Sequence, residues 1–256
     1  MLNLTPASSP KSEECDDYHE TIEYVQPQLR HGIHKEQSAS KRFISPTIKL
    51  PEAFNREEKK EKMTRLFQIV RPAFKCSYQI IPDGEEPLYK VKNLPYHKGG
   101  KPDLALLDGP DETAPVLIVC HMPKLSRHFK IGFGDPTGPE PIVWEDFIKP
   151  KLGSLERKIS VSFSGDGHIV ETGQGEREEF TWKRTRHVSV LGKKSRAASL
   201  HNRKLVDEQG NILAIFTHAT AIGVAGWLQI EVDRGRDFDL MVMMTALSIH
   251  EWMRRQ

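Results

Sequence analysis

One stretch of the sequence gathers many basic side chains and contains no acidic ones. Between Phe180 and Val206 there is no Asp or Glu, whereas the basic residues are Lys183, Arg184, Arg186, Lys193, Lys194, Arg196, Arg203 and Lys204. If a strand, a loop and the next strand fold back on one another here, these charges gather on one rim. Such a rim attracts phosphate groups, and each Lys or Arg near an anionic membrane contributes about 1 kcal/mol before salt screening. The alternative is a solvated loop between two strands, and the spacing leaves both interpretations open.

Other reactive residue types lack the spacing that catalysis or metal binding requires. Six histidines form no H-x-x-x-H or H-E-x-x-H pair: His121, His128, His187, His201, His218 and His250. Cys120 and His121 are adjacent, so on a strand they point to opposite faces and cannot act as nucleophile and base. The glycines of GFGDPTG (132–138) are typical of a connecting turn, since no helix start follows them. The sequence therefore predicts a non-enzymatic protein without a metal site or cofactor.

The composition indicates an intracellular protein. Lys and Arg (37) nearly balance Asp and Glu (35), so net charge alone favours neither a nucleic-acid binder nor a membrane-surface protein. The cysteines Cys15, Cys76 and Cys120 form no C-x-x-C pair and fit free thiols in a reducing compartment. No signal peptide and no segment of transmembrane length is found. We expect a cytoplasmic protein, with a peripheral membrane or nuclear location as alternatives.

The chain divides into a tail and a strand-rich domain. Residues 1–60 show no sustained period, so we expect a flexible tail, and residues 65–256 form the predicted domain. Twelve short runs in that domain are rich in β-branched and aromatic residues and are separated by turn formers, which predicts strands. These runs cover residues 66–70, 77–81, 88–92, 103–107, 116–122, 128–133, 143–149, 158–164, 179–186, 203–208, 212–218 and 227–233. Alternation such as Ile159, Val161 and Phe163 against Ser160 and Ser162 predicts that one face is dry.

A run near the C-terminus is apolar on every side of a helix. Since a helix turns about 100° per residue, five successive apolar residues, Leu240 to Met244, sweep more than a full circle. The run is too short for a bilayer, which takes about 20 apolar residues, so burial in protein is predicted. A barrel of about twelve strands has an interior wider than its own side chains fill, and a helix over 238–253 suits it. We expect Asp237 or Asp239 to cap the start of this helix.

The fold class is therefore mainly β, a closed antiparallel barrel of about twelve strands that encloses a C-terminal apolar α-helix. This plan resembles the tubby C-terminal-like superfamily, which includes tubby proteins, phospholipid scramblases and LURP-one-related proteins, and its fungal members in particular. The resemblance rests on FTWKR (180–184), LVDEQGNILAIF (205–216), GWLQIEV (226–232) and DFDLMVMMTALSI (237–249). It implies a fold much better than an activity. Tubby relatives bind phosphoinositide head groups through basic residues on the barrel, which implies a similar role for the basic stretch.

Several functions remain open at the level of sequence. The first is binding of an anionic phospholipid, such as a phosphoinositide, or of another anionic partner through the basic stretch. The second is a protein-interaction scaffold in which the tail over residues 1–60 recruits partners and the barrel is inert. Scramblase-like lipid movement is disfavoured because the final helix is too short to span a bilayer. Nucleic-acid binding is disfavoured because Trp182 is the single aromatic residue between Thr181 and Leu205 on which a base could stack.

A kinase motif inside the basic stretch predicts regulation. In KKSRAAS, Arg196 lies three residues before Ser199, as in the sites of basophilic kinases. A phosphate on Ser199 adds about two negative charges, so we expect phosphorylation to weaken anion binding there. Mass spectrometry of the protein isolated from its own cells should detect phosphorylated Ser199. A spectrum in which this serine is always unmodified would remove the hypothesis.

Overall fold

The computed structural model describes residues 64–72, 75–94, 101–124, 126–190, 192–193 and 201–256. The predicted tail over residues 1–60 lies outside these ranges. All twelve predicted strands occur within them, with ends that differ by a few residues at most. The two-residue strand β9 was not predicted. With it, the described residues contain the strands β1 (Arg65–Val70), β2 (Ser77–Pro82), β3 (Tyr89–Asn93), β4 (Leu104–Leu107), β5 (Val116–His121), β6 (Phe129–Phe133), β7 (Val143–Ile148), β8 (Arg157–Phe163), β9 (Ile169–Val170), β10 (Glu176–Arg184), β11 (Arg203–Val206), β12 (Ile212–His218) and β13 (Val224–Ile230).

The strands form a closed antiparallel ring. Each strand from β1 to β8 pairs with the next, β10 to β13 do the same, and β13 pairs with β1. The ring closes because β10 also pairs with β8, with Glu176 opposite Phe163 and Trp182 opposite Arg157. The two-residue β9 pairs with β8 and stands beside the ring. Twelve strands of the described chain therefore make the barrel, which confirms the predicted fold class and leaves the ring without open edges.

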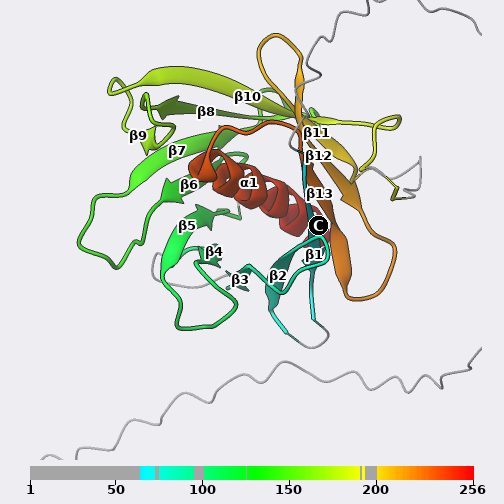
Figure 1. Ribbon diagram of the computed structural model, residues 1–256. Coiled ribbons are helices and arrows are strands. Elements are labelled where there is room, and N and C mark those ends of the chain that lie inside the picture. Colours follow the sequence, from blue (N-terminus) through cyan, green and yellow to red (C-terminus); the bar gives the residue numbers. More distant parts are fainter. Residues whose placement is uncertain (1–63, 73–74, 95–100, 125, 191, 194–200) are drawn as a thin grey trace, which may run out of the picture. The chain divides into compact units, whose positions relative to one another are not determined.

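The helix α1 (Arg236–Arg254) lies inside this ring (Figure 1). It begins two residues earlier and ends one residue later than predicted, and every residue from Leu240 to Glu251 is buried. The predicted core residues of the helix are all part of one hydrophobic core with the strands: Leu240, Met241, Val242, Met243, Met244, Ala246, Leu247 and Ile249. In the described part of the chain, no helix has the length and apolar content that crossing a bilayer requires.

The start of α1 differs from the prediction. Its N-cap is Gly235, at φ 87°, and no side chain caps the first turn. Asp237 instead accepts a hydrogen bond from the backbone N–H of Ile169, at 3.1 Å, and Asp239 pairs with Arg65 at 2.8 Å. The expectation that Asp237 or Asp239 caps the helix was therefore wrong, because Asp237 ties the first turn to β9 and Asp239 ties it to β1. Their charge near the positive end of the helix dipole remains favourable.

A polar contact in the middle of the barrel fixes α1 against β10. The indole Nε1–H of Trp182 donates to the hydroxyl of Thr245 at 2.9 Å, and this hydroxyl donates to the carbonyl of Met241 at 2.7 Å. Trp182 and Thr245 are completely buried. Because a buried donor without a partner is costly, this contact favours one rotational setting of the helix inside the barrel.

We expect Thr245→Val to lower the free energy of unfolding by about 1–3 kcal/mol. Valine keeps the shape of threonine but leaves the buried indole N–H of Trp182 without an acceptor. Denaturant unfolding followed by tryptophan fluorescence measures the loss. Ser248→Ala is the matched control, since the Ser248 hydroxyl donates to the carbonyl of Thr245 and its removal leaves no donor unsatisfied. Equal losses in the two variants would contradict the proposed role of the indole contact.

Candidate functional site

The basic stretch forms part of a two-stranded section of the barrel wall. In the pairing of β10 with β11, Lys183 lies opposite Lys204 and Arg184 lies opposite Arg203. Trp182 and Leu205 are fully buried against the core. Since side chains alternate along a strand, Lys183 and Lys204 point to the outer face, where both are partly exposed.

The two outward lysines are a like-charged cross-strand pair. Side chains directly opposite each other on one face come within about 5.5 Å at Cβ, and like charges in that position are destabilising. Among the described residues, neither ammonium group forms an ion pair, and the nearby Glu179 is engaged with Lys158 at 2.6 Å. The pair therefore concentrates positive charge that an anion would neutralise. We call Lys183 and Lys204 the outer lysine pair.

Other residues of the basic stretch have different positions. Arg186 is exposed just after β10. Lys193 is half-buried, with its Nζ 5.5 Å from the centre of the Trp227 ring on β13. Lys194, Arg196 and Ser199 lie outside the described residues, so the structure adds nothing to the predictions made for them.

Arg203 points inward from its strand. Its side chain is 3% exposed, donates a hydrogen bond to the carbonyl of Leu155, and places Nη2 3.3 Å from the sulfur of Met253 near the end of α1. Burial, with a smaller contribution from the neighbouring Arg184, lowers the pKa of Arg203 to about 10. The basic side chains were expected to gather on one rim of the barrel. The strands do not bring all of them there. The outer lysine pair faces outward, and Arg203 binds the end of the helix.

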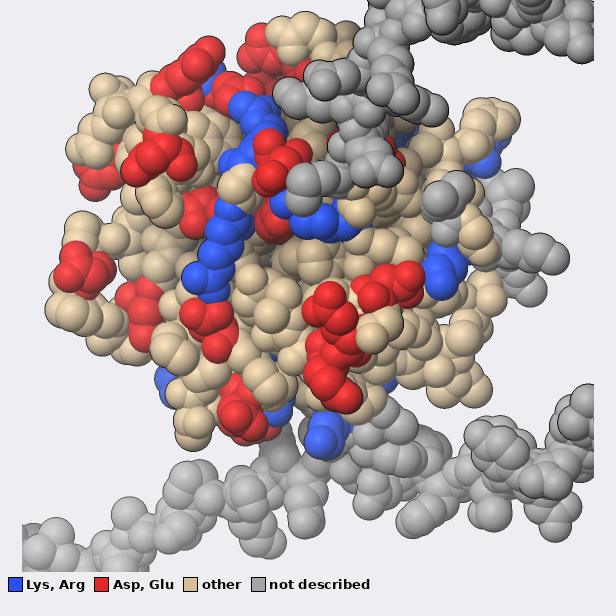
Figure 2. All heavy atoms as spheres, viewed as in Figure 1, with Lys and Arg blue, Asp and Glu red and all other residues tan. Residues whose placement is uncertain are grey.

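One face of the molecule carries charges of both signs. On the face seen in Figure 2, groups of Lys and Arg side chains lie beside groups of Asp and Glu side chains, so that face carries no broad field of one sign. This agrees with the near balance of charge in the whole sequence. Any attraction for an anion must then come from a local group of cations.

The C-terminal end of α1 is held by a buried carboxylate. Glu251 is fully buried and accepts from Arg254 at 2.7 and 2.9 Å, from Arg255 at 2.7 Å and from the hydroxyl of Tyr78. Arg255 also donates to Asp103 at 2.9 Å, which ties the helix end to the wall. Burial alone would raise the pKa of Glu251, but the hydrogen bonds from Arg254, Tyr78 and Arg255 outweigh it and hold the pKa at about 2. The carboxylate is therefore ionised over the physiological range.

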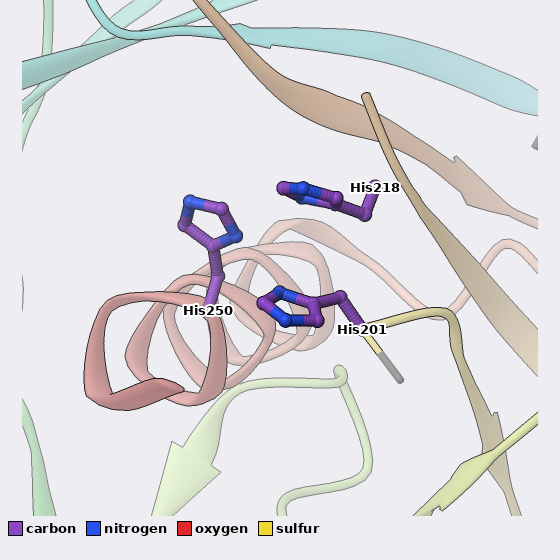
Figure 3. Close-up of side chains that lie close together, drawn as sticks. All are labelled: His201, His218 and His250. Atoms are coloured by element: carbon purple, nitrogen blue, oxygen red, sulfur yellow. The ribbon is translucent and has the colours of Figure 1, made fainter. Parts of the chain in front are cut away.

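Three histidines meet beside this helix end. His250 lies on α1, His218 ends β12, and His201 stands two residues before β11, and their rings face a common space (Figure 3). Each ring offers a nitrogen, and these three nitrogens all lie within 4.8 Å of one another. The ring centres of His201 and His218 are 4.6 Å apart, and those of His218 and His250 are 5.4 Å apart. We call these three residues the histidine cluster.

Burial keeps the cluster uncharged at neutral pH. Burial is the main reason why the pKa of His250 falls to about 3. The positive charge of neighbouring residues acts in the same direction. Burial also lowers the pKa values of His201 and His218. All three imidazoles are thus in the form that has a lone pair on one ring nitrogen.

No metal site was expected at these histidines, because their spacing in the sequence does not bring them together. His201 lies opposite His218 if the pairing of Arg203 with Phe216 is continued outward. An irregularity between Leu205 and Val206 shifts the register by one residue. A regular hairpin counted from the turn at Gly210 would have placed His201 beside Thr217 instead, so the cluster depends on a bulge that local residue types do not reveal.

The opposite mouth of the barrel has a hollow of about 640 Å³ near the start of α1. Arg65 lines it and pairs with Asp233 at 3.0 Å and with Asp239 at 2.8 Å. Burial raises the pKa of Asp239 to about 6 in spite of the opposing charge of Arg65. Because Arg65, Asp233 and Asp239 are paired with each other, these three side chains offer an incoming ligand little charge that is uncompensated.

Comparison with known proteins finds a similar structure but no family. No family model matches the chain, and no curated protein matches it. Among solved structures, the chain is similar to the X-ray structure of a protein from Arabidopsis thaliana, with 13% sequence identity and a TM-score of 0.42. The similarity covers 73% of this chain and 90% of that one.

We expect Glu251→Gln to lower the free energy of unfolding at pH 7 by about 3 kcal/mol, because it removes the charge that compensates the buried end of the Arg255 side chain. The wild-type advantage is complete above pH 4.5, the ordinary pKa of a glutamate, and declines as the pH falls towards about 2, the pKa in the folded protein. Urea unfolding of both proteins at several pH values measures this difference.

Asp146→Asn is the control for a surface pair. Asp146 contacts Lys130 at 3.2 Å, and both side chains are about 60% exposed, so we expect a change of less than about 1 kcal/mol. A loss for Glu251→Gln that is equally small, or that does not depend on pH, would show that the carboxylate does not hold the helix end.

Proposed function

We propose that this protein is a distant, tubby-like member of the tubby C-terminal-like superfamily and a binding domain without catalytic activity. Its ligand is an anionic phospholipid head group of the phosphoinositide class, bound on the outer face of β10 and β11. The outer lysine pair forms the centre of this site, and Arg186 and Lys193 extend it. Lys194 and Arg196 are added from their positions in the sequence.

The observation that carries the proposal is the outer lysine pair. Two ammonium groups held opposite each other on neighbouring strands repel, and a phosphate placed between them would turn this repulsion into two charge-assisted contacts. The strand pairing fixes the backbone spacing of the two lysines before the ligand arrives, which reduces the entropy lost on binding. Peripheral binding of this kind would place the barrel at the surface of an anionic membrane.

The proposal of binding without catalysis agrees with how the barrel is filled. The space enclosed by the strands is occupied by the buried length of α1. Cys120, a reactive residue type on β5, is fully buried, and burial raises its thiol pKa well above the ordinary value. A thiol that stays protonated is a poor nucleophile. We therefore assign Cys120 a packing role in the hydrophobic core.

Liposome cosedimentation tests the site. The double variant Lys183→Glu/Lys204→Glu should bind vesicles containing a phosphoinositide more than about 30-fold more weakly than the wild type. Loss of two lysine contributions of about 1 kcal/mol each accounts for about 30-fold, and the new negative charges add repulsion. Wild-type binding should also weaken as the salt concentration rises.

A matched double variant separates the site from net charge. Lys92→Glu/Lys101→Glu makes the same change in charge on β3 and the loop after it, on the other side of the ring from β10 and β11. We expect this variant to bind vesicles almost as well as the wild type. If both double variants lose binding equally, the attraction is unspecific, and if neither loses it, the lipid site is not on β10 and β11.

A further inference from the structure

The histidine cluster joins three parts of the chain at one end of the barrel. His201 lies two residues before β11, His218 is the last residue of β12, and His250 belongs to α1. In Figure 3 the ring of His250 points from the helix towards the rings of His201 and His218. The side chain of His250 is 6% exposed, whereas His201 and His218 are partly exposed. The cluster is therefore rooted in the core and open towards the surface.

The spacing of the ring nitrogens suits a metal ion after a small adjustment. Zinc binds imidazole nitrogen at about 2.0–2.1 Å, so three such nitrogens in a tetrahedral site lie about 3.3 Å from one another. The nitrogens of the cluster all lie within 4.8 Å of one another. Small side-chain rotations, mainly of the partly exposed His201, can close the remaining distance.

A hydrogen bond behind His218 sets the orientation that a metal ligand needs. Its Nδ1 lies 3.1 Å from the backbone carbonyl of Ala225, an acceptor, so Nδ1 carries the proton and Nε2 keeps its lone pair. Metal-binding histidines almost always have such a support on the second ring nitrogen.

The buried Nδ1 of His250 has no hydrogen-bond partner among the described residues. A polar atom that is left unsatisfied in a protein interior costs free energy. The walls around this ring are aromatic, since Tyr78 and Phe216 lie edge-on to it with ring centres 6.1 and 5.9 Å away. A ligand that accepts the lone pairs of the cluster would remove this cost.

We propose that His201, His218 and His250 together bind one divalent transition-metal ion, for which zinc is the natural candidate. Neutral imidazoles suit zinc, copper and nickel, whereas calcium and magnesium require oxygen ligands. The nearest carboxylate on the helix, Glu251, is fully engaged with Arg254, Arg255 and Tyr78. Three protein ligands leave a fourth position on zinc, which a water molecule or a small anion fills.

The charges around the site act in both directions. The positive charges of Arg203 and Arg254 lie close enough to disfavour a bound cation, whereas the negative charge of Glu251 favours one. The negative end of the α1 dipole, near His250, also favours a cation. A bound ion would join the last turns of α1 to β11 and β12, and would stabilise the folded barrel at this end.

Cobalt(II) is the probe for the test, because its visible spectrum distinguishes tetrahedral from octahedral coordination. The full chain is treated with a chelator, the chelator is removed, and cobalt is added stepwise. We expect one equivalent to bind with a tetrahedral spectrum, zinc to displace it, and zinc alone to raise the thermal midpoint of unfolding.

The variants His201→Gln and His218→Gln remove one ligand each. Each should bind cobalt at least about 10-fold more weakly, since even the loss of a second-shell partner costs 10- to 100-fold, and each should lose the thermal shift. Circular dichroism checks that the variants are folded. If one of the two variants does not fold, the other variant and the wild-type spectrum still test the proposal.

Two controls identify binding at other histidines. His31 and His34 are three residues apart in the sequence and could bind a metal ion by themselves. His121 stacks on Trp144, with ring centres 5.4 Å apart, on the outside of β5. The variants His31→Ala/His34→Ala and His121→Gln should keep the tetrahedral spectrum. An octahedral spectrum in the wild type, or a spectrum that survives both His201→Gln and His218→Gln, would overturn the proposal.

Discussion

The structure depends on one constraint, namely that a helix apolar on every side needs apolar contacts on every side. No single sheet face can provide them, because a sheet covers one side of a helix only. A ring of twelve strands, spaced about 4.8 Å apart and tilted about 40°, has a radius of roughly 12 Å. That leaves room for the backbone of α1 and for one layer of side chains from helix and wall. The completely buried residues of α1, such as Met241, Val242 and Leu247, fill this layer.

The polar contacts of the interior have a different role from its apolar ones. They lie at defined levels along α1: Asp239 with Arg65 at one mouth, Thr245 with Trp182 in the middle, and Glu251 with Arg254 and Arg255 at the other mouth. The apolar area that is buried changes little when a helix that is apolar all round is rotated, whereas a buried hydrogen bond has one correct partner. These contacts therefore set the rotation and depth of the helix, while apolar burial supplies most of the stability.

Much of the fold could be predicted from residue patterns, and most of the site could not. The strands and α1 follow from alternation and from an apolar run, which are local properties of the sequence. The inward position of Arg203 was also accessible, because Leu205 on the same strand is a core residue and the two share a face. The meeting of His201, His218 and His250 was not, since it depends on a one-residue irregularity in β11 and on the rotation of α1 inside the ring. The roles of Asp237 and Asp239 were missed because their partners, Ile169 and Arg65, are distant in the chain.

The pairing of β1 with β13 has a consequence for how the protein is made. These strands are the first and the last of the ring in chain order, and α1 follows both. During translation the ribosome therefore releases eleven of the twelve ring strands before β13, the partner that closes the edge of β1, and before the helix that fills the lumen. Until then the inner surface of the nascent sheet is uncovered, and the closing step joins residues more than 150 positions apart. Folding of this barrel is completed late and by non-local contacts, so the apolar inner surface stays open to aggregation until the ring closes.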